Sequence, residues 1–210
     1  MIIAMEQVRH GAYSNPDTFA WTPGQQSVLV SFGCGNSGAE LVDLTTQQIA
    51  QQYPGGASYQ PNGSFILGEW YGANMISLGL ANLNAAEHSI LTSAPALASG
   101  YTTSLGDASW GPDGQTAYYE HNNGIWAVGA DGSNAHQVVA GAADDSQSNA
   151  TVLAMPSVSP DGSLLLYVQL KGSDTVGGAV TYQCSVTQTN GSTTTVLPTG
   201  ASSAVWRPVK

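Results

Sequence analysis

The side chains that could do acid–base, nucleophilic or metal chemistry are few in this chain of 210 residues. The histidines show no His-x-His or His-x3-His spacing, which would place two imidazoles on one metal ion. The nucleophile motif Gly-x-Ser-x-Gly is absent, and neither Cys34 nor Cys184 has a neighbouring histidine. We therefore predict no catalytic residues. The two cysteines are expected as buried thiols, unless the fold brings their Cβ atoms close enough for a disulfide.

Carboxylates offer a second kind of chemistry. Glu6, Glu69 and Glu120 stand at similar places, late in three apolar segments. Two carboxylates catalyse glycoside hydrolysis, one as acid and one as base or nucleophile, when they converge to about 5 to 9.5 Å. The alternation of side chains along a strand also explains a polar residue at this place. A glycan-cleaving enzyme is therefore the runner-up to a non-enzymatic protein.

A sequence repeat must position these side chains. Five segments share an aromatic residue or Val, one spacer and Pro, and their prolines are 38, 51, 48 and 48 residues apart. Three of the segments continue with Asp-Gly or Asn-Gly. The residues of the repeat are Trp21, Pro23, Tyr59, Pro61, Trp110, Pro112, Asp113, Gly114, Pro160, Asp161, Gly162, Trp206 and Pro208.

Each repeat unit reads as four short strands joined by tight turns. Pro presets φ, and the Asp-Gly or Asn-Gly that follows tolerates positive φ, so this motif joins two antiparallel strands. In the third unit, strands are expected at 116–120, 125–128 and 137–139, with turns at 122–124 and 130–134. One such sheet cannot bury both of its faces. The units are therefore expected to stack radially as the blades of an all-β propeller.

The third unit, residues 108–139, resembles the TolB-like, WD-like β-propeller repeat. It carries Trp-x-Pro-Asp-Gly, then an apolar strand, then Ala-Asp-Gly-Ser-Asn before Gln-Val-Val. The resemblance extends from about Phe19 to Pro208, although the first unit has Pro23-Gly24-Gln25 in place of Pro-Asp-Gly. Such a resemblance implies a binding or scaffolding module rather than an enzyme.

We predict one domain, residues 1–210, with four full blades of four antiparallel strands at about 19–55, 56–94, 107–141 and 156–200. Reading Pro208 onward into Met1 restores the register of the repeat, because an apolar strand follows the proline. Residues 201–210 and 1–18 are therefore expected to form a composite fifth blade. The family usually has six or more blades, so a part of a larger propeller, or a ring completed by a second copy, stays open.

Two aspartates are expected near one mouth of the central channel. Asp17 and Asp107 stand at or just before the start of an innermost strand, where oxygen ligands could hold Ca²⁺. Units two and four have Gly56 and Pro156 near this place, so such a ring of ligands would be incomplete. We predict no cofactor, with Ca²⁺ as the alternative.

Aromatic residues and loops supply the candidate binding surface. The ring at the repeat position is expected to pack between blades. The long connections 93–106 and 140–156 are the expected contact loops. The candidate binding residues are Trp70, Tyr71, Tyr118, Tyr119, Trp126, Asp144 and Asp145.

Composition narrows the partners. With 4 Lys+Arg against 14 Asp+Glu, the net charge is −10, yet only 9% of residues are charged, against about 25% in an ordinary domain. The four Lys and Arg residues are too few and too scattered to bind a phosphate backbone, which excludes nucleic acid as a partner. No apolar run reaches the roughly 18 residues that a membrane-spanning helix needs. No signal peptide is visible at the N-terminus. The neutral polar surface and the resemblance favour an extracellular or periplasmic location in the cell envelope.

These observations favour a recognition or scaffolding propeller that binds a protein or peptide through its loops. A carbohydrate-binding or glycoside-cleaving propeller is the first alternative, because exposed aromatic rings stack on sugars. A self-associating element of a cell-surface assembly is the second. A homo-oligomer would follow if a second chain completed the ring.

Overall fold

The computed structural model contains sixteen β-strands and no helix among the residues that it describes. Those residues are 16–21, 26–32, 38–53, 57–60, 65–71, 75–82, 88–95, 106–141, 151–172, 180–197 and 206. No helix in these ranges could span a membrane.

The strands form four antiparallel sheets, each with four strands in chain order. Sheet 1 contains β1 (Pro16–Trp21), β2 (Ser27–Phe32), β3 (Gly38–Asp43) and β4 (Ile49–Tyr53). Sheet 2 contains β5 (Ala57–Tyr59), β6 (Phe65–Tyr71), β7 (Met75–Asn82) and β8 (His88–Pro95). Sheet 3 contains β9 (Gly106–Trp110), β10 (Thr116–His121), β11 (Gly124–Gly129) and β12 (His136–Val139). Sheet 4 contains β13 (Thr151–Val158), β14 (Leu164–Gly172), β15 (Val180–Gln188) and β16 (Thr194–Val196).

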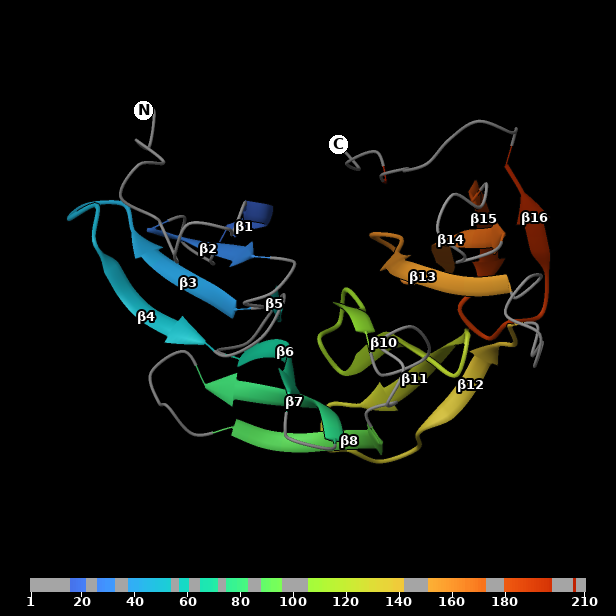
Figure 1. The fold of residues 1–210 in the computed structure, drawn as a ribbon, viewed down its shortest axis with the longest axis horizontal. Helices are drawn as coiled ribbons and strands as arrows, with labels where there is room; N and C mark the ends of the chain where they lie inside the picture. Colours follow the sequence, from blue (N-terminus) through green and yellow to red (C-terminus); the bar gives the residue numbers. More distant parts are fainter. Residues whose placement is uncertain are drawn as a thin grey trace.

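The four sheets follow one another along an arc (Figure 1). Contacts join sheet 1 to sheet 2 through β5, sheet 2 to sheet 3 through β9, and sheet 3 to sheet 4 through β13. Sheets 1 and 4 lie on the two sides of the opening of the arc. The all-β architecture of four-stranded antiparallel sheets is thus confirmed. The number of blades and their boundaries stay predictions.

Apolar clusters join neighbouring sheets. Leu78 and Leu80 of β7 pack against Trp110 and Tyr119 of sheet 3. On the opposite face of sheet 3, Tyr118 packs in a cluster that includes Leu165 and Tyr167 of β14. Each large ring buried there removes about 150 to 250 Å² of surface from water. The sheets are therefore held together by their faces, as radial stacking requires.

Trp206 repeats this packing on the far face of sheet 4. It contacts a cluster formed by Leu166, Val168 and Cys184, and its indole Nε1 donates a hydrogen bond to the Ser157 carbonyl at 3.0 Å. Trp206 thus contacts the preceding sheet, as Trp110 does. The composite blade expected from residues 201–210 and 1–18 stays a prediction, because all of these except 16–18 and Trp206 lie outside the described ranges.

Cys184 is a buried residue of β15. Cys34 is not among the described residues, so a bond between the two cysteines stays open.

The Pro-Asp-Gly turns have the local structure that their residues dictate. The Asp113 carboxylate accepts a hydrogen bond from the Gln115 backbone N–H at 2.9 Å, and the Asp161 carboxylate accepts one from Ser163 N–H at 3.1 Å. The following residue, Gly114, has φ +67°, a left-handed conformation that glycine adopts without strain. These turns all lie at one end of their sheets.

Sheet 4 begins earlier than the sequence indicated. The expected loop 140–156 is wrong in its last residues, because β13 begins at Thr151, which pairs with Lys171 of the antiparallel strand β14. A bulge at Met155, which has φ 54°, interrupts the pairing between Ala154 and Ser157 and so hides the strand pattern. The expected loop 93–106 is also shorter, because β8 continues to Pro95 and β9 begins at Gly106.

Candidate functional site

The β9–β10 and β13–β14 turns lie at the same end of sheets 3 and 4, and we call this end the turn face. Two hollows adjoin each other there. The first hollow, of about 490 Å³, is lined by polar residues of sheet 3 that include Gln115, Asp131 and His136. The second, of about 260 Å³, lies between the turns of sheets 3 and 4, and Asp113 and Asp161 line it. Thr116 lines both hollows, so they form one continuous surface.

The first hollow carries one carboxylate among neutral polar groups. The Asp131 carboxylate accepts a hydrogen bond from Ser133 N–H at 2.9 Å. The Ser133 hydroxyl and this N–H hold the pKa of Asp131 below its ordinary value. His136 Nδ1 lies 2.7 Å from the Asn134 carbonyl. Because a carbonyl only accepts, Nδ1 carries the proton, which leaves Nε2 available to a ligand.

The second hollow carries two carboxylates. One oxygen of Asp161 accepts hydrogen bonds from the Ser159 hydroxyl at 2.5 Å and from the Ser163 hydroxyl at 2.9 Å. These bonds, together with that from Ser163 N–H, lower the pKa of Asp161 to about 2. Asp161 is therefore anionic throughout the physiological range. No hydrogen bond of the described residues uses the second oxygen of Asp113 or Asp161.

The Tyr118 ring also lines the second hollow. Burial raises the pKa of Tyr118, and the negative charge of Asp113 raises it further. The Tyr118 hydroxyl is hydrogen-bonded to Thr189, whose own hydroxyl donates to the Gly162 carbonyl at 3.1 Å. Because Thr189 and Gly162 belong to sheet 4, these bonds fix one wall of the hollow across the boundary between the sheets.

The structure corrects the expectation that Tyr118 and Tyr119 present their rings to a partner. Tyr118 is 8% exposed and Tyr119 is 1% exposed. β10 lies between two neighbouring sheets, so both of its faces are covered, and the two rings belong to the two inter-sheet clusters. Only an edge of Tyr118 reaches the surface, in the second hollow.

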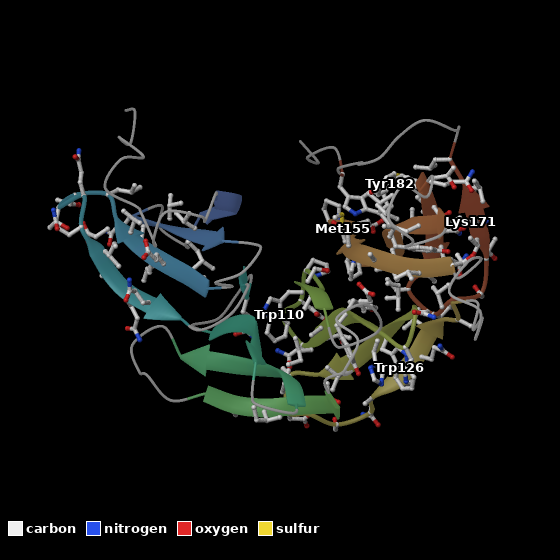
Figure 2. All side chains as sticks on the ribbon, in the orientation of Figure 1. Trp110, Trp126, Met155, Lys171 and Tyr182 are labelled. Atoms are coloured by element: carbon white, nitrogen blue, oxygen red, sulfur yellow. The ribbon has the colours of Figure 1, made fainter. Side chains whose placement is uncertain are left out.

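Trp126 is partly buried against the cluster between sheets 2 and 3. Its ring meets that of His121 in a T-shaped arrangement, with the ring centroids 5.2 Å apart. Figure 2 shows Trp110 toward the inner side of the arc and Trp126 within sheet 3. Trp70 and Tyr71 are the last residues of β6, but their side chains are outside the described part of the chain. Asp144 and Asp145 also lie outside it.

The described residues bring no metal ligands together. Asp17 lies in β1 and Asp107 lies in β9, and their side chains are not among those described. Among the described residues, no group of three or more His, Cys, Asp or Glu could hold a metal ion. Glu120 is a partly buried residue of β10, whereas Glu6 and the Glu69 side chain lie outside the described set. The carboxylate convergence that glycoside hydrolysis needs therefore stays a prediction.

Sequence reasoning missed the two hollows. It identified Asp113, Asp131 and Asp161 as turn residues, and their hydrogen bonds show that role. What it did not indicate is that the turns of sheets 3 and 4 adjoin. The only available signal was the recurrence of Pro-Asp-Gly at the same place in consecutive blades.

No protein-family model matches this chain, and no characterised protein matches it by sequence. Solved structures do match. A protein assigned as TolB from Agrobacterium tumefaciens superposes with a TM-score of 0.64 at 16% identity, over 87% of this chain and 64% of that one. The β-propeller domain of Cps50 (Swd1) from Myceliophteria thermophila gives a TM-score of 0.54 at 12% identity, over 90% of this chain and 76% of that one.

A chain of a nidogen/laminin complex also matches, with a TM-score of 0.54 at 12% identity, over 82% of this chain and 61% of that one. This chain thus spans less than two thirds of the length of the TolB structure. At these identities the similarity establishes the fold. It confirms the β-propeller and the resemblance to TolB and WD-like structures.

Proposed function

We propose that this chain is a non-enzymatic β-propeller that recognises a protein or peptide partner through the turn face. The observation that carries the proposal is the continuous surface of two hollows, lined by Asp113, Asp131 and Asp161. Small-molecule sites are typically hollows of roughly 300 to 1,000 Å³, and the first hollow, of about 490 Å³, falls within this range. One of the matched structures is a chain of a nidogen/laminin complex.

Recognition fits this surface better than catalysis does. The Asp161 carboxylate, with its pKa of about 2, is hydrogen-bonded within its turn. General acid–base catalysis at neutral pH works best with groups that titrate near the working pH. Such a carboxylate provides a fixed negative charge instead, which suits binding. A contact surface on residues 96–105 and 142–150 stays a prediction, because these residues lie outside the described ranges.

A peptide array tests the proposal. The full chain, fluorescently labelled, is incubated with a library of twelve-residue peptides of random sequence, and the hits are measured by calorimetry. We expect saturable binding that the double substitution Asp113→Asn with Asp131→Asn weakens. Asn keeps the acceptor oxygen that closes each turn, so the fold is preserved. The matched control Lys171→Ala, at the opposite end of sheet 4, should bind like the natural chain. Peptide binding that ignores the double substitution would contradict the assignment to the turn face.

Carbohydrate binding is the second candidate, because Trp126 is only partly buried and lies beside His121. Aromatic rings with polar neighbours bind sugar rings through their apolar faces. A glycan array with the natural chain and Trp126→Ala tests it. A positive spot that Trp126→Ala removes would support this function, and an array without signal would exclude it.

Self-association is the third candidate. Met155 and Tyr182 are 58% and 48% exposed, and both lie on sheet 4, beside the opening of the arc (Figure 2). Light scattering over a hundredfold range of concentration distinguishes a monomer from an assembly. We propose an extracellular or periplasmic location, supported by the low content of charged residues, and fractionation of the source cells tests it.

A further inference from the structure

We propose that the second hollow is a socket for an arginine side chain of the partner. This inference rests on the proposed function, since it names the group by which a protein or peptide would be held. It is carried by the shape of the hollow, by its charge and by the ring that lines it.

The shape suits a long side chain with an apolar stem. Pro112 and Val158 line the hollow together with the Tyr118 ring, and the hollow holds about 260 Å³. The two turns already touch on one side, since a Cβ on Gly162 would lie 3.4 Å from Cγ of Pro112. The hollow, which we call the slot, thus lies between the turns of two sheets, with Asp113 and Asp161 exposed and Pro112 and Val158 partly buried, so the apolar residues can contact the methylene stem of a bound side chain.

The charge of the slot is negative, and none of the described residues neutralises it. Asp113 and Asp161 each commit one carboxylate oxygen to their own turn. Neither forms an ion pair with another described residue. Lys171, the one Lys or Arg among the described residues, lies near the far end of β14, whereas Asp161 stands just before its beginning. Within the described ranges, no residue therefore supplies the positive charge that would complement this slot, and a ligand could supply it.

Arginine fits these groups better than lysine. The guanidinium is planar, presents five N–H donors in a fixed arrangement, and stacks on aromatic faces. It can donate to Asp113 and Asp161 at once through separate N–H groups, whereas the Tyr118 ring, only 8% exposed, forms part of the wall of the hollow. An ammonium group is a compact, strongly hydrated charge without this planar set of donors, so it matches two carboxylates less well.

A bound metal ion is the competing occupant, and the slot is poor in ligands for it. Ca²⁺ takes six to eight oxygen ligands, and the slot offers two carboxylates with one uncommitted oxygen each. No third His, Cys, Asp or Glu joins them among the described residues. Ca²⁺ is therefore included as an arm of the test.

The test is a nuclear magnetic resonance titration of the ¹⁵N-labelled full chain with N-acetyl-arginine amide. Three further probes are used: the neutral isostere N-acetyl-citrulline amide, N-acetyl-lysine amide and CaCl₂. We expect saturable shifts at Gly111, Asp113 and Gly162 with the arginine probe. The citrulline probe should bind about tenfold more weakly, because its side chain is uncharged and its hydrogen bonds to the carboxylates are therefore weaker.

Substitutions assign the site. Asp113→Asn should weaken the arginine probe about tenfold, since it removes one charge and keeps the turn. Asp43→Asn is the matched control, because the Asp43 carboxylate accepts hydrogen bonds from the Thr45 and Thr46 N–H groups in a turn of sheet 1 and lines neither hollow; it should change the affinity by less than about twofold. Three results would each overturn the proposal. The arginine and citrulline probes could bind equally well, the shifts could be confined to other residues, or Ca²⁺ could bind more tightly than the arginine probe at the same signals. Asp161→Asn is a second variant, which should also weaken binding of the arginine probe. If Asp161→Asn fails to fold, the result with Asp113→Asn decides the test.

The peptide array separates the two proposals. Hits that contain no arginine, with affinities unchanged by Asp113→Asn, would leave the proposed function standing and overturn the socket. Binding of the arginine probe in the slot, without a single peptide hit, would support the socket and contradict peptide recognition.

Discussion

The side chains of Tyr118 and Tyr119, adjacent residues of β10, pack against the two sheets that flank sheet 3. The Tyr118 ring packs against sheet 4 and its hydroxyl is hydrogen-bonded to Thr189 of the β15–β16 turn. The Tyr119 ring packs against sheet 2 and its hydroxyl is hydrogen-bonded to Thr92 of β8. Because successive side chains of a strand point to opposite faces, two adjacent tyrosines connect three consecutive sheets of the arc.

This relationship predicts similar losses from two conservative substitutions. Tyr118→Phe and Tyr119→Phe each remove one hydroxyl that joins two sheets, and a hydrogen bond contributes about 0.5 to 1.5 kcal/mol to the free energy of unfolding. Each variant should therefore lose about 1 kcal/mol in urea denaturation, and Tyr119→Ala about 3 to 5 kcal/mol. Thr92→Val is the matched control, since it should cost about as much as Tyr119→Phe and add little to it in the double variant. Fully additive losses would contradict the hydrogen bond.

The order of the sheets could be predicted from the sequence, because it depends on local chemistry. Pro112, Asp113 and Gly114 specify a turn wherever they occur, and the residues after them alternate as a strand does. The burial of Tyr118 and Tyr119 could not be predicted, because alternation does not tell whether one face or both faces of a strand are covered. The start of β13 was missed because the bulge at Met155 breaks the alternation.

The slot could not be predicted either. It depends on Pro112 and Gly162, fifty residues apart in the sequence, lying side by side. That contact is set by how two sheets pack, and a repeat in the sequence does not specify it.

Two glycines with the same conformation should respond differently to alanine. Gly191 has φ +75°, and a Cβ there would lie 2.2 Å from the Val138 carbonyl of sheet 3. Gly132 has φ +81°, but its Cβ would meet nothing closer than 3.5 Å. Gly132→Ala should lower the free energy of unfolding by about 1 to 2 kcal/mol, which is the cost of holding an alanine in the left-handed conformation. Gly191→Ala must in addition separate sheets 3 and 4, so it should lower the melting temperature clearly more than Gly132→Ala. Equal losses would show that the close approach to Val138 is relieved without cost.

Asp161 should make stability depend on acidity. The pKa of Asp161 is lowered from 3.8 in the unfolded chain to about 2 in the folded one, so the folded state favours the charged form. The stabilisation is fully present above pH 3.8 and is lost as the pH falls toward about 2. In Asp161→Asn this contribution is absent, so the difference in stability between the natural chain and the variant should shrink over this window. The check is urea denaturation at pH 6, 4, 3 and 2, with Asp113→Asn measured in parallel. A difference that stays constant from pH 6 to 2 would contradict the assignment.

Trp206 should control the accessibility of Cys184. The thiol is 1% exposed and lies in the cluster that Trp206 covers from outside. Trp206→Ala removes this cover and the hydrogen bond to the Ser157 carbonyl, which is 3.0 Å long. Burial of a large aromatic side chain is typically worth about 3 to 5 kcal/mol, so local opening of the cluster becomes more frequent. In a Cys34→Ser background, the rate at which Ellman's reagent modifies Cys184 under native conditions should rise at least about tenfold. Trp206→Phe keeps a ring in place and loses only the hydrogen bond, so its rate should lie between the two. An unchanged rate in Trp206→Ala would mean that another part of the chain covers Cys184.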